Sequence, residues 1–210
     1  MKPWILYDIE IKEIPYTGGE KEEGLIYCDG WRDYEHMTVT VISAYSYADD
    51  SYSIFLQDNL EEFQQLLDES EEIIGFNSES FDDLVCAAIG LKVRTTYDIL
   101  REAYRAAGLN PNPDWESLGK RKKAGDKEAE ALLNHYKGYR LQDIAMSNLG
   151  VGKSGSGDNA AVLWQRGQLG KVINYCQRNV WLSKRIFDKR DCLISPVDQS
   201  VELFLREPGP

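Results

Sequence analysis

PWILYDIEIKEI, residues 3–14, is a run of Trp, Ile, Leu and Tyr interrupted by isolated charges. Aromatic and β-branched residues favour strands, so this segment is predicted to be a central strand of a sheet. Side chains two positions apart on a strand share a face, so Asp8 and Glu10 project together. Buried carboxylates are costly unless solvent or a cation meets them. The pair therefore indicates either a solvent-facing edge or a site for a cation.

The residues that follow predict a meander of strands and then alternating strands and helices. Further strands are expected at 24–30, 37–47, 51–56, 73–76 and 200–206. Helices are expected from a cap at Asp58 through Leu67, and at 81–89, 97–107, 141–149, 159–167 and 170–190. This order predicts an α/β protein in which helices flank a central mixed sheet of about five strands.

A second polar group follows the strand expected at 73–76. Gly75-Phe76-Asn77 leads into a turn, and Asp82 comes in the first turn of the next helix. A carboxylate there interacts favourably with the helix dipole, and Asn stabilises turns. Local structure alone would account for both residues.

A third polar pair lies in the last long helix, in the sequence Tyr175-Cys176-Gln177-Arg178-Asn179. Residues four apart share a helix face, so the Tyr175 hydroxyl and the Asn179 amide are expected to point the same way. Taken alone, the pair is also typical of a core tyrosine with a polar neighbour.

In combination and in order, the three segments resemble the three motifs of the DEDD (DnaQ-like) 3′–5′ exonucleases of the RNase H-like superfamily, in the subgroup that uses Tyr rather than His. Asp8-Ile9-Glu10 matches D-x-E, and residues 75–82 match G-[FY]-N-x-x-x-[FY]-D. Residues 175–180 match Y-C-x-x-D-V except at Asn179, where the family has Asp. Residues 141–145 and 149–154 resemble a stretch that often precedes the third motif in phage and bacterial members. The resemblance covers roughly residues 3–108 and 139–190.

This resemblance implies an RNase H-like fold and hydrolysis of phosphodiester bonds with two Mg²⁺ or Mn²⁺ ions. It implies that Asp8 bridges both ions, that Glu10 and Asn179 complete the nucleophile-side ion, and that Asp82 binds the other mainly through water. The Tyr175 hydroxyl would orient the attacking water. Contacts to substrate are implied for Asn77, Phe81 and Lys153.

Asn179 is the departure from the family pattern. An amide offers a metal one neutral oxygen and removes a negative charge from the site, so weaker metal binding and a slower reaction are expected. Three explanations are open: an engineered substitution, a natural member with reduced or altered activity, and a binding protein that has lost catalysis.

Composition limits the remaining possibilities. The net charge of −11 argues against a protein that coats nucleic acid through a basic surface. No run approaches the roughly 20 apolar residues that span a bilayer, and no signal-peptide pattern opens the sequence. The four cysteines are widely spaced and contain no C-x-x-C pair, which favours reduced, mostly buried thiols and a cytoplasmic location.

The segment Gly150-Val151-Gly152-Lys153-Ser154 resembles part of a P-loop, but it lacks the first Gly of that motif, and a helix rather than a strand is expected before it.

Residues 1–210 are predicted to form one RNase H-like domain with a basic helical insertion at about 109–138. The run Lys120–Lys123 in this insertion indicates either a contact to a nucleic-acid backbone or a solvated helix face.

The sequence therefore predicts a metal-dependent 3′–5′ exonuclease that acts on DNA 3′ ends, prefers single strands and is impaired by Asn179. The alternatives are a catalytically inactive nucleic-acid-binding module on the same fold and a 3′–5′ exoribonuclease. In each case the partner is a nucleic acid and not a membrane.

Overall fold

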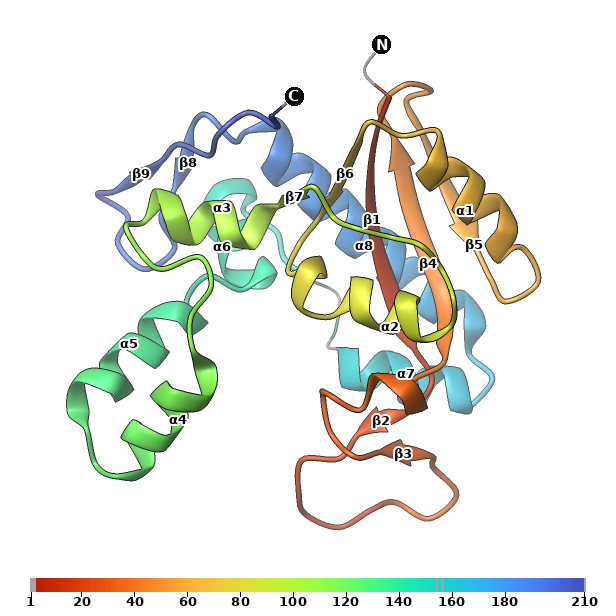
Figure 1. Cartoon of the computed structure of the whole chain (residues 1–210), viewed down its shortest axis with the longest axis horizontal. Coiled ribbons are helices and arrows are strands. Elements are labelled where there is room, and N and C mark those ends of the chain that lie inside the picture. The colour runs from red at the N-terminus through yellow and green to blue at the C-terminus, as the bar shows by residue number, and fades with distance from the viewer. Residues whose placement is uncertain (1–2, 154, 156, 210) are drawn as a thin grey trace. The chain divides into compact units, whose positions relative to one another are not determined.

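The computed structural model describes residues 3–153, 155 and 157–209. Its central feature is a five-stranded sheet in the order β5-β4-β1-β6-β7 (Figure 1). The strands are β1 (Trp4–Ile11), β4 (Val39–Ser46), β5 (Ser51–Phe55), β6 (Glu72–Gly75) and β7 (Tyr97–Asp98). β1 is antiparallel to β4 and parallel to β6, so the sheet is mixed. The predicted α/β fold with a central mixed sheet of five strands is confirmed.

The alternation of β1 separates an apolar face from a polar one. Ile5, Tyr7, Ile9 and Ile11 belong to one hydrophobic core, whereas Asp8 and Glu10 lie between them in sequence and face the other side. The register with β4 shifts between Glu10 and Ile11, which is a bulge at the end of the polar face. β1 therefore presents its two carboxylates together at one end of the strand.

Different helices cover the two faces of the sheet. The core around Tyr7 includes Phe63 and Leu67 of α1 (Leu60–Asp68) and Val85 and Cys86 of α2 (Asp82–Ala88). A second core joins Val41 of β4 to α7 (Gly157–Gln165) and α8 (Leu169–Asp188). Figure 1 shows α2 in front of the sheet and α8 behind it.

Several element boundaries differ from those expected. Residues 97–107 were expected to be helical throughout, but Tyr97 and Asp98 form β7 and α3 covers Ile99–Ala106. The N-cap of α1 is Asn59, not Asp58, and its side-chain oxygen accepts the Leu56 amide at 2.7 Å. Of the strand expected at 24–30, only β3 (Tyr27–Cys28) forms, and it pairs with β2 (Ile14–Pro15) outside the main sheet.

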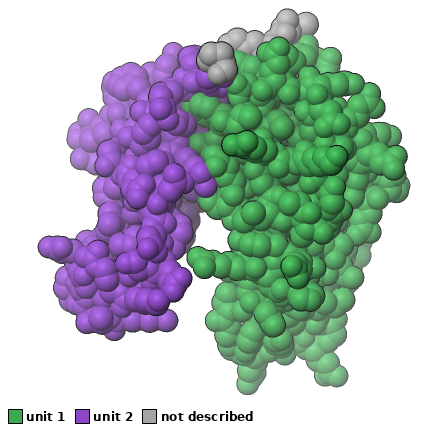
Figure 2. Space-filling view, in the orientation of Figure 1, with its two compact units in different colours: residues 1–98, 153–184 green, residues 99–152, 185–210 purple. Residues whose placement is uncertain are grey.

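The chain divides into two compact units, which Figure 2 colours separately. Unit 1 comprises residues 1–98 and 153–184 and contains the five-stranded sheet. Unit 2 comprises residues 99–152 and 185–210. It contains α3, α4 (Trp115–Lys123), α5 (Lys127–Lys137), α6 (Leu141–Leu149), β8 (Leu193–Ile194) and β9 (Glu202–Leu203). The helices of the predicted insertion, α4 and α5, lie within unit 2.

Tyrosine rings and one amide organise the interior of unit 2. Tyr104 contacts Tyr136 and Tyr139, with ring centroids 4.8 and 5.8 Å apart. The Asn148 side chain accepts the Ile194 amide at 2.6 Å and donates to the Ile194 carbonyl at 2.9 Å, which joins α6 to β8.

Within the described residues, no helix has the length and apolar character that a membrane span requires.

Candidate metal centre

Asp8 and Glu10 of β1 form the first part of the candidate site. Both side chains point away from the Tyr7 core, and Glu10 is only 6% exposed. Asp8 is half-buried. Asp8 is paired with Ser43 of β4 and Glu10 with Val41, so backbone pairing with β4 holds the two carboxylates in place.

Asp82 reaches the same place from the first turn of α2. Its carboxylate accepts the backbone amide of Ile9 at 3.1 Å, between the two acidic residues of β1. Asp82 is itself buried. The turn before α2 and the end of β6 therefore determine where the third carboxylate lies.

The turn between β6 and α2 contains a residue in the left-handed conformation, and the Ser78 side chain packs closely against the Gly75 backbone. Asn77 has φ 63°, a conformation that Asn tolerates better than most residues. Asp98 of β7 accepts the amides of Asn77 and Glu79 at 3.0 and 3.2 Å. A Cβ at Gly75 would lie 2.0 Å from the Ser78 hydroxyl, so only glycine fits there. Asp98 thus supports the turn, a role that was not expected from its position in the sequence.

α8 supplies the remaining side chains. The Asn179 amide nitrogen donates to Asp8 Oδ2 at 3.2 Å and to Glu10 Oε1 at 3.3 Å. One turn earlier, Cys176 Sγ lies 3.3 Å from the Asp8 carbonyl oxygen and 3.6 Å from Asp8 Oδ2. Asp8, Glu10 and Cys176 each place one potential ligand atom within 4.8 Å of the others. Residues 175–179 therefore meet β1 at its two carboxylates.

Burial raises the pKa values of Asp8, Glu10 and Asp82, and repulsion between the acids adds to the rise for Glu10 and Asp82. Burial and the charge of Asp8 raise the pKa of both Glu10 and Asp82 well above the usual values. Burial also raises the pKa of Asp8, and the Lys153 ammonium opposes that rise. Such repulsion is relieved when a cation binds.

The donor set fits a hard divalent cation. Mg²⁺ and Mn²⁺ prefer oxygen ligands. The carboxylates of Asp8 and Glu10 lie together, and that of Asp82 lies beside them on the Ile9 amide. Asn179 is 2% exposed, and its Oδ1 atom has no hydrogen-bond partner among the described residues. A buried oxygen without a partner beside carboxylates suits a ligand to a cation. Asp8, Glu10, Asp82 and Asn179 could therefore hold such an ion.

Lys153 and Tyr175 lie on one side of the acidic cluster. The Lys153 ammonium is 5.2 Å from the centroid of the Tyr175 ring. Although burial disfavours its charge, the carboxylate of Asp8 raises the pKa of Lys153. The Tyr175 hydroxyl is buried, and no described residue gives it a hydrogen bond of standard geometry. Gly150, with φ 69°, ends α6 just before this segment, so a helix and not a P-loop strand precedes Lys153. Ser154 of the same stretch lies outside the described residues.

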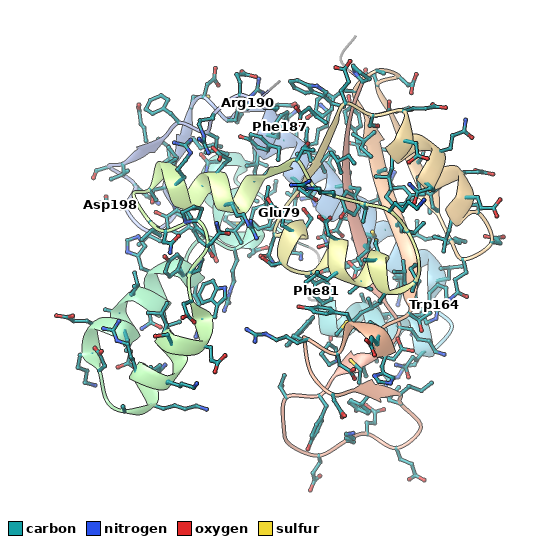
Figure 3. The ribbon with its side chains drawn as sticks, viewed as in Figure 1. Glu79, Phe81, Trp164, Phe187, Arg190 and Asp198 are labelled. Atoms are coloured by element: carbon teal, nitrogen blue, oxygen red, sulfur yellow. The ribbon has the colours of Figure 1, made fainter. Side chains whose placement is uncertain are left out.

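An aromatic cluster lies next to Asp82. The Phe81 ring is 5.7 Å from Trp31 and 6.3 Å from Tyr34, both edge-on, and Figure 3 labels Phe81 at the start of α2. Trp31 is 45% exposed, which is unusual for so large an apolar ring. The sequence indicated Phe81 but neither partner. An isolated Trp in a polar loop was the available signal.

The basic run belongs to unit 2 and is largely neutralised within it. Lys120 pairs with Glu116 at 2.6 Å, and Arg121 pairs with Asp126 at 2.8 Å. Lys122 lies 3.5 Å from Glu130. These pairs favour the solvated helix face over a contact to nucleic acid.

No protein-family model matches the chain, and no curated protein does. A search of solved structures finds a similarity to the family B DNA polymerase from the hyperthermophilic archaeon Pyrobaculum calidifontis, at 14% sequence identity and a TM-score of 0.48. The match covers 88% of this chain and 24% of the polymerase chain, so the chain spans about a quarter of the length of the protein that it matches.

Proposed function

We propose that this protein is a divalent-metal-dependent 3′–5′ exonuclease of the DEDD type, acting on the 3′ end of single-stranded DNA. The observation that carries the proposal is the convergence of Asp8, Glu10 and Asp82 with Asn179, from three separate segments. The resemblance of these segments to the family motifs supports the same conclusion. Two Mg²⁺ or Mn²⁺ ions are implied by that resemblance.

Each side chain has a role in this proposal. Asp8, Glu10 and Asp82 would hold the metal, which supplies Lewis-acid stabilisation of the phosphate when bound. The Tyr175 hydroxyl, buried beside Lys153, would orient the attacking water. Asn77, in its left-handed turn, would contact the substrate or hold the loop that carries Asp82.

The aromatic cluster supports a substrate with unpaired bases. Phe81 directly precedes Asp82, so a base on Phe81 or Trp31 would belong to a nucleotide close to the acidic residues. Base stacking on aromatic side chains is the common mode of single-strand binding and tolerates any sequence. A duplex end would have to fray to reach it.

Asn179 favours a second candidate function, a nucleic-acid-binding module without catalysis. Its amide already bonds to Asp8 and Glu10, and it brings no negative charge. A protein of this kind would bind a 3′ end without hydrolysing it.

The test is degradation of 3′-labelled and 5′-labelled DNA and RNA in Mn²⁺ by the chain and by its Asn179→Asp variant. We expect loss of the 3′ label first and faster hydrolysis by Asn179→Asp, because the restored carboxylate strengthens metal binding. Binding of the 3′ end with no hydrolysis by either protein would establish the second candidate. Equal rates for both proteins would refute the assignment of Asn179.

A further inference from the structure

The charges around Asp8 and Glu10 limit how many dications this site can neutralise. The carboxylates of Asp8 and Glu10 lie together, and that of Asp82 lies beside them on the Ile9 amide and repels both. Position 179 adds no fourth carboxylate. A site with a fourth carboxylate would balance two dications. The charge at residue 179 therefore bears directly on the number of bound ions.

The Asn179 amide already occupies one oxygen of each β1 acid. Its N–H groups face Asp8 Oδ2 and Glu10 Oε1 at 3.2 and 3.3 Å, so the positive end of the amide dipole lies between the two carboxylates. This arrangement reduces the repulsion between the acids without any ion. It also competes with a cation for the same two oxygens.

Lys153 adds a full positive charge on the same side. Its ammonium lies over the ring of Tyr175, which is one helical turn from Asn179 on α8. The charge of Lys153 acts on both Asp8 and Glu10. A lysine ammonium is a compact point charge that can take the place of a cation near carboxylates.

The balance of charge then favours a single ion. Three carboxylates and one ammonium leave about two negative charges, which one dication neutralises. A second dication would leave an excess of positive charge among buried groups, which is costly. The buried Asn179 Oδ1 atom, which bonds to none of the described residues, is an independent sign that a ligand site exists here.

We propose that this site binds one divalent ion rather than two, and that Lys153 together with the Asn179 amide supplies the positive charge on the Tyr175 side. This inference rests on the proposed function. Lys153 is then a catalytic residue that stabilises charge near the attacking water, in addition to any contact with the substrate. The ion is held by the acids of β1 and α2.

The test counts Mn²⁺ bound by the full chain, from the electron paramagnetic resonance signal of the free ion, with no substrate present. We expect one ion for the unaltered chain and two for a double variant, Lys153→Met with Asn179→Asp. The matched control is Lys21→Met with Asn179→Asp. It has the same total charge and removes a lysine that lies 4.5 Å from the ring of a different tyrosine, Tyr16. In the control the second ion should bind at least about tenfold more weakly than in the double variant.

Two ions of similar affinity on the unaltered chain would overturn the inference and leave the exonuclease proposal standing. One ion on the double variant would also overturn it, because residues 153 and 179 would then not determine the count. No bound Mn²⁺ at millimolar concentration would overturn both proposals. The number of Mn²⁺ ions bound by the unaltered chain tests the inference without any variant, so the test remains valid even if a variant fails to fold.

Discussion

Asp82 and Asp83 are adjacent in the chain and have opposite surroundings. Asp83 accepts hydrogen bonds from the Tyr7 hydroxyl and, at 2.8 Å each, from the backbone amide and hydroxyl of Thr95. Asp82 accepts one amide from β1 and faces the charge of Asp8. A carboxylate whose partners are all present stabilises the fold, whereas one that faces other carboxylates is suited to a cation.

The same difference separates the two faces of β1. On the Tyr7 face, polar groups are few and bonded to one another within an apolar core. On the opposite face, among the described residues, Asn179 Oδ1 has no hydrogen-bond partner and the Tyr175 hydroxyl has none of standard geometry. Buried polar groups without partners are rare in folded proteins, so their presence on one face distinguishes the candidate site from the apolar core.

The largest expected effect is on the polar face. Asp8→Asn should lower hydrolysis by about 100- to 1000-fold, the scale of losing one preorganised electrostatic group. It should not lower the stability of the metal-free protein, because it removes a carboxylate from a set that repels itself. Single-turnover assays and urea unfolding in EDTA measure the two quantities. A metal-free protein destabilised by several kcal/mol would show that Asp8 is structural.

Asp83→Ala should give the converse result. It leaves the Tyr7 hydroxyl and two groups of Thr95 without their acceptor, so the free energy of unfolding should fall by about 3 kcal/mol. The number of Mn²⁺ ions bound by the folded protein should be unchanged. Urea unfolding and metal titration below the transition check both statements. Loss of metal binding by a folded Asp83→Ala protein would contradict the division between the two acids.

The sequence predicts the polar face of β1 better than the contacts that surround it, because only regular periodicity can be recognised from the sequence alone. The alternation of β1 was sufficient to place Asp8 and Glu10 on one face, because a strand has a fixed period of two. The helical period likewise placed Tyr175 and Asn179 together. The contacts of Asp83, Asp98 and Trp31 join segments far apart in the chain, and no local pattern encodes them. Asp98 was expected to begin a helix, because a two-residue strand leaves too short a signal.

The pH dependence of stability sharpens the comparison further. The pKa values of Glu10 and Asp82 are raised on folding, through burial and the charge of Asp8, above ordinary values of 4.5 and 3.8. As the pH rises above these ordinary values, Glu10 and Asp82 lose their protons in the unfolded chain but keep them in the folded protein. The free energy of unfolding of the metal-free protein therefore falls with pH until the pH exceeds the pKa values of the folded state. A bound dication offsets this loss and adds about 2.7 kcal/mol at 100 times Kd.

Thermal unfolding with EDTA and with Mn²⁺ between pH 5 and pH 8 measures this difference. The gap between the two melting temperatures should widen as the pH rises, and Asp82→Asn should reduce the widening. A difference in melting temperature that is constant with pH would mean that the metal does not bind to Glu10 and Asp82.

The smallest effect is expected in unit 2, where the charges of the basic run are exposed and paired. Lys120 and Arg121 form exposed ion pairs with Glu116 and Asp126, and such pairs contribute less than about 1 kcal/mol. Lys120→Glu should therefore change stability by no more than about 0.5 kcal/mol. Because this charge is already matched within the unit, the salt dependence of single-stranded DNA binding should also be unchanged. A slope of log K against log salt that falls by about one would show instead that Lys120 contacts a phosphate, and the binding surface would then extend to α4.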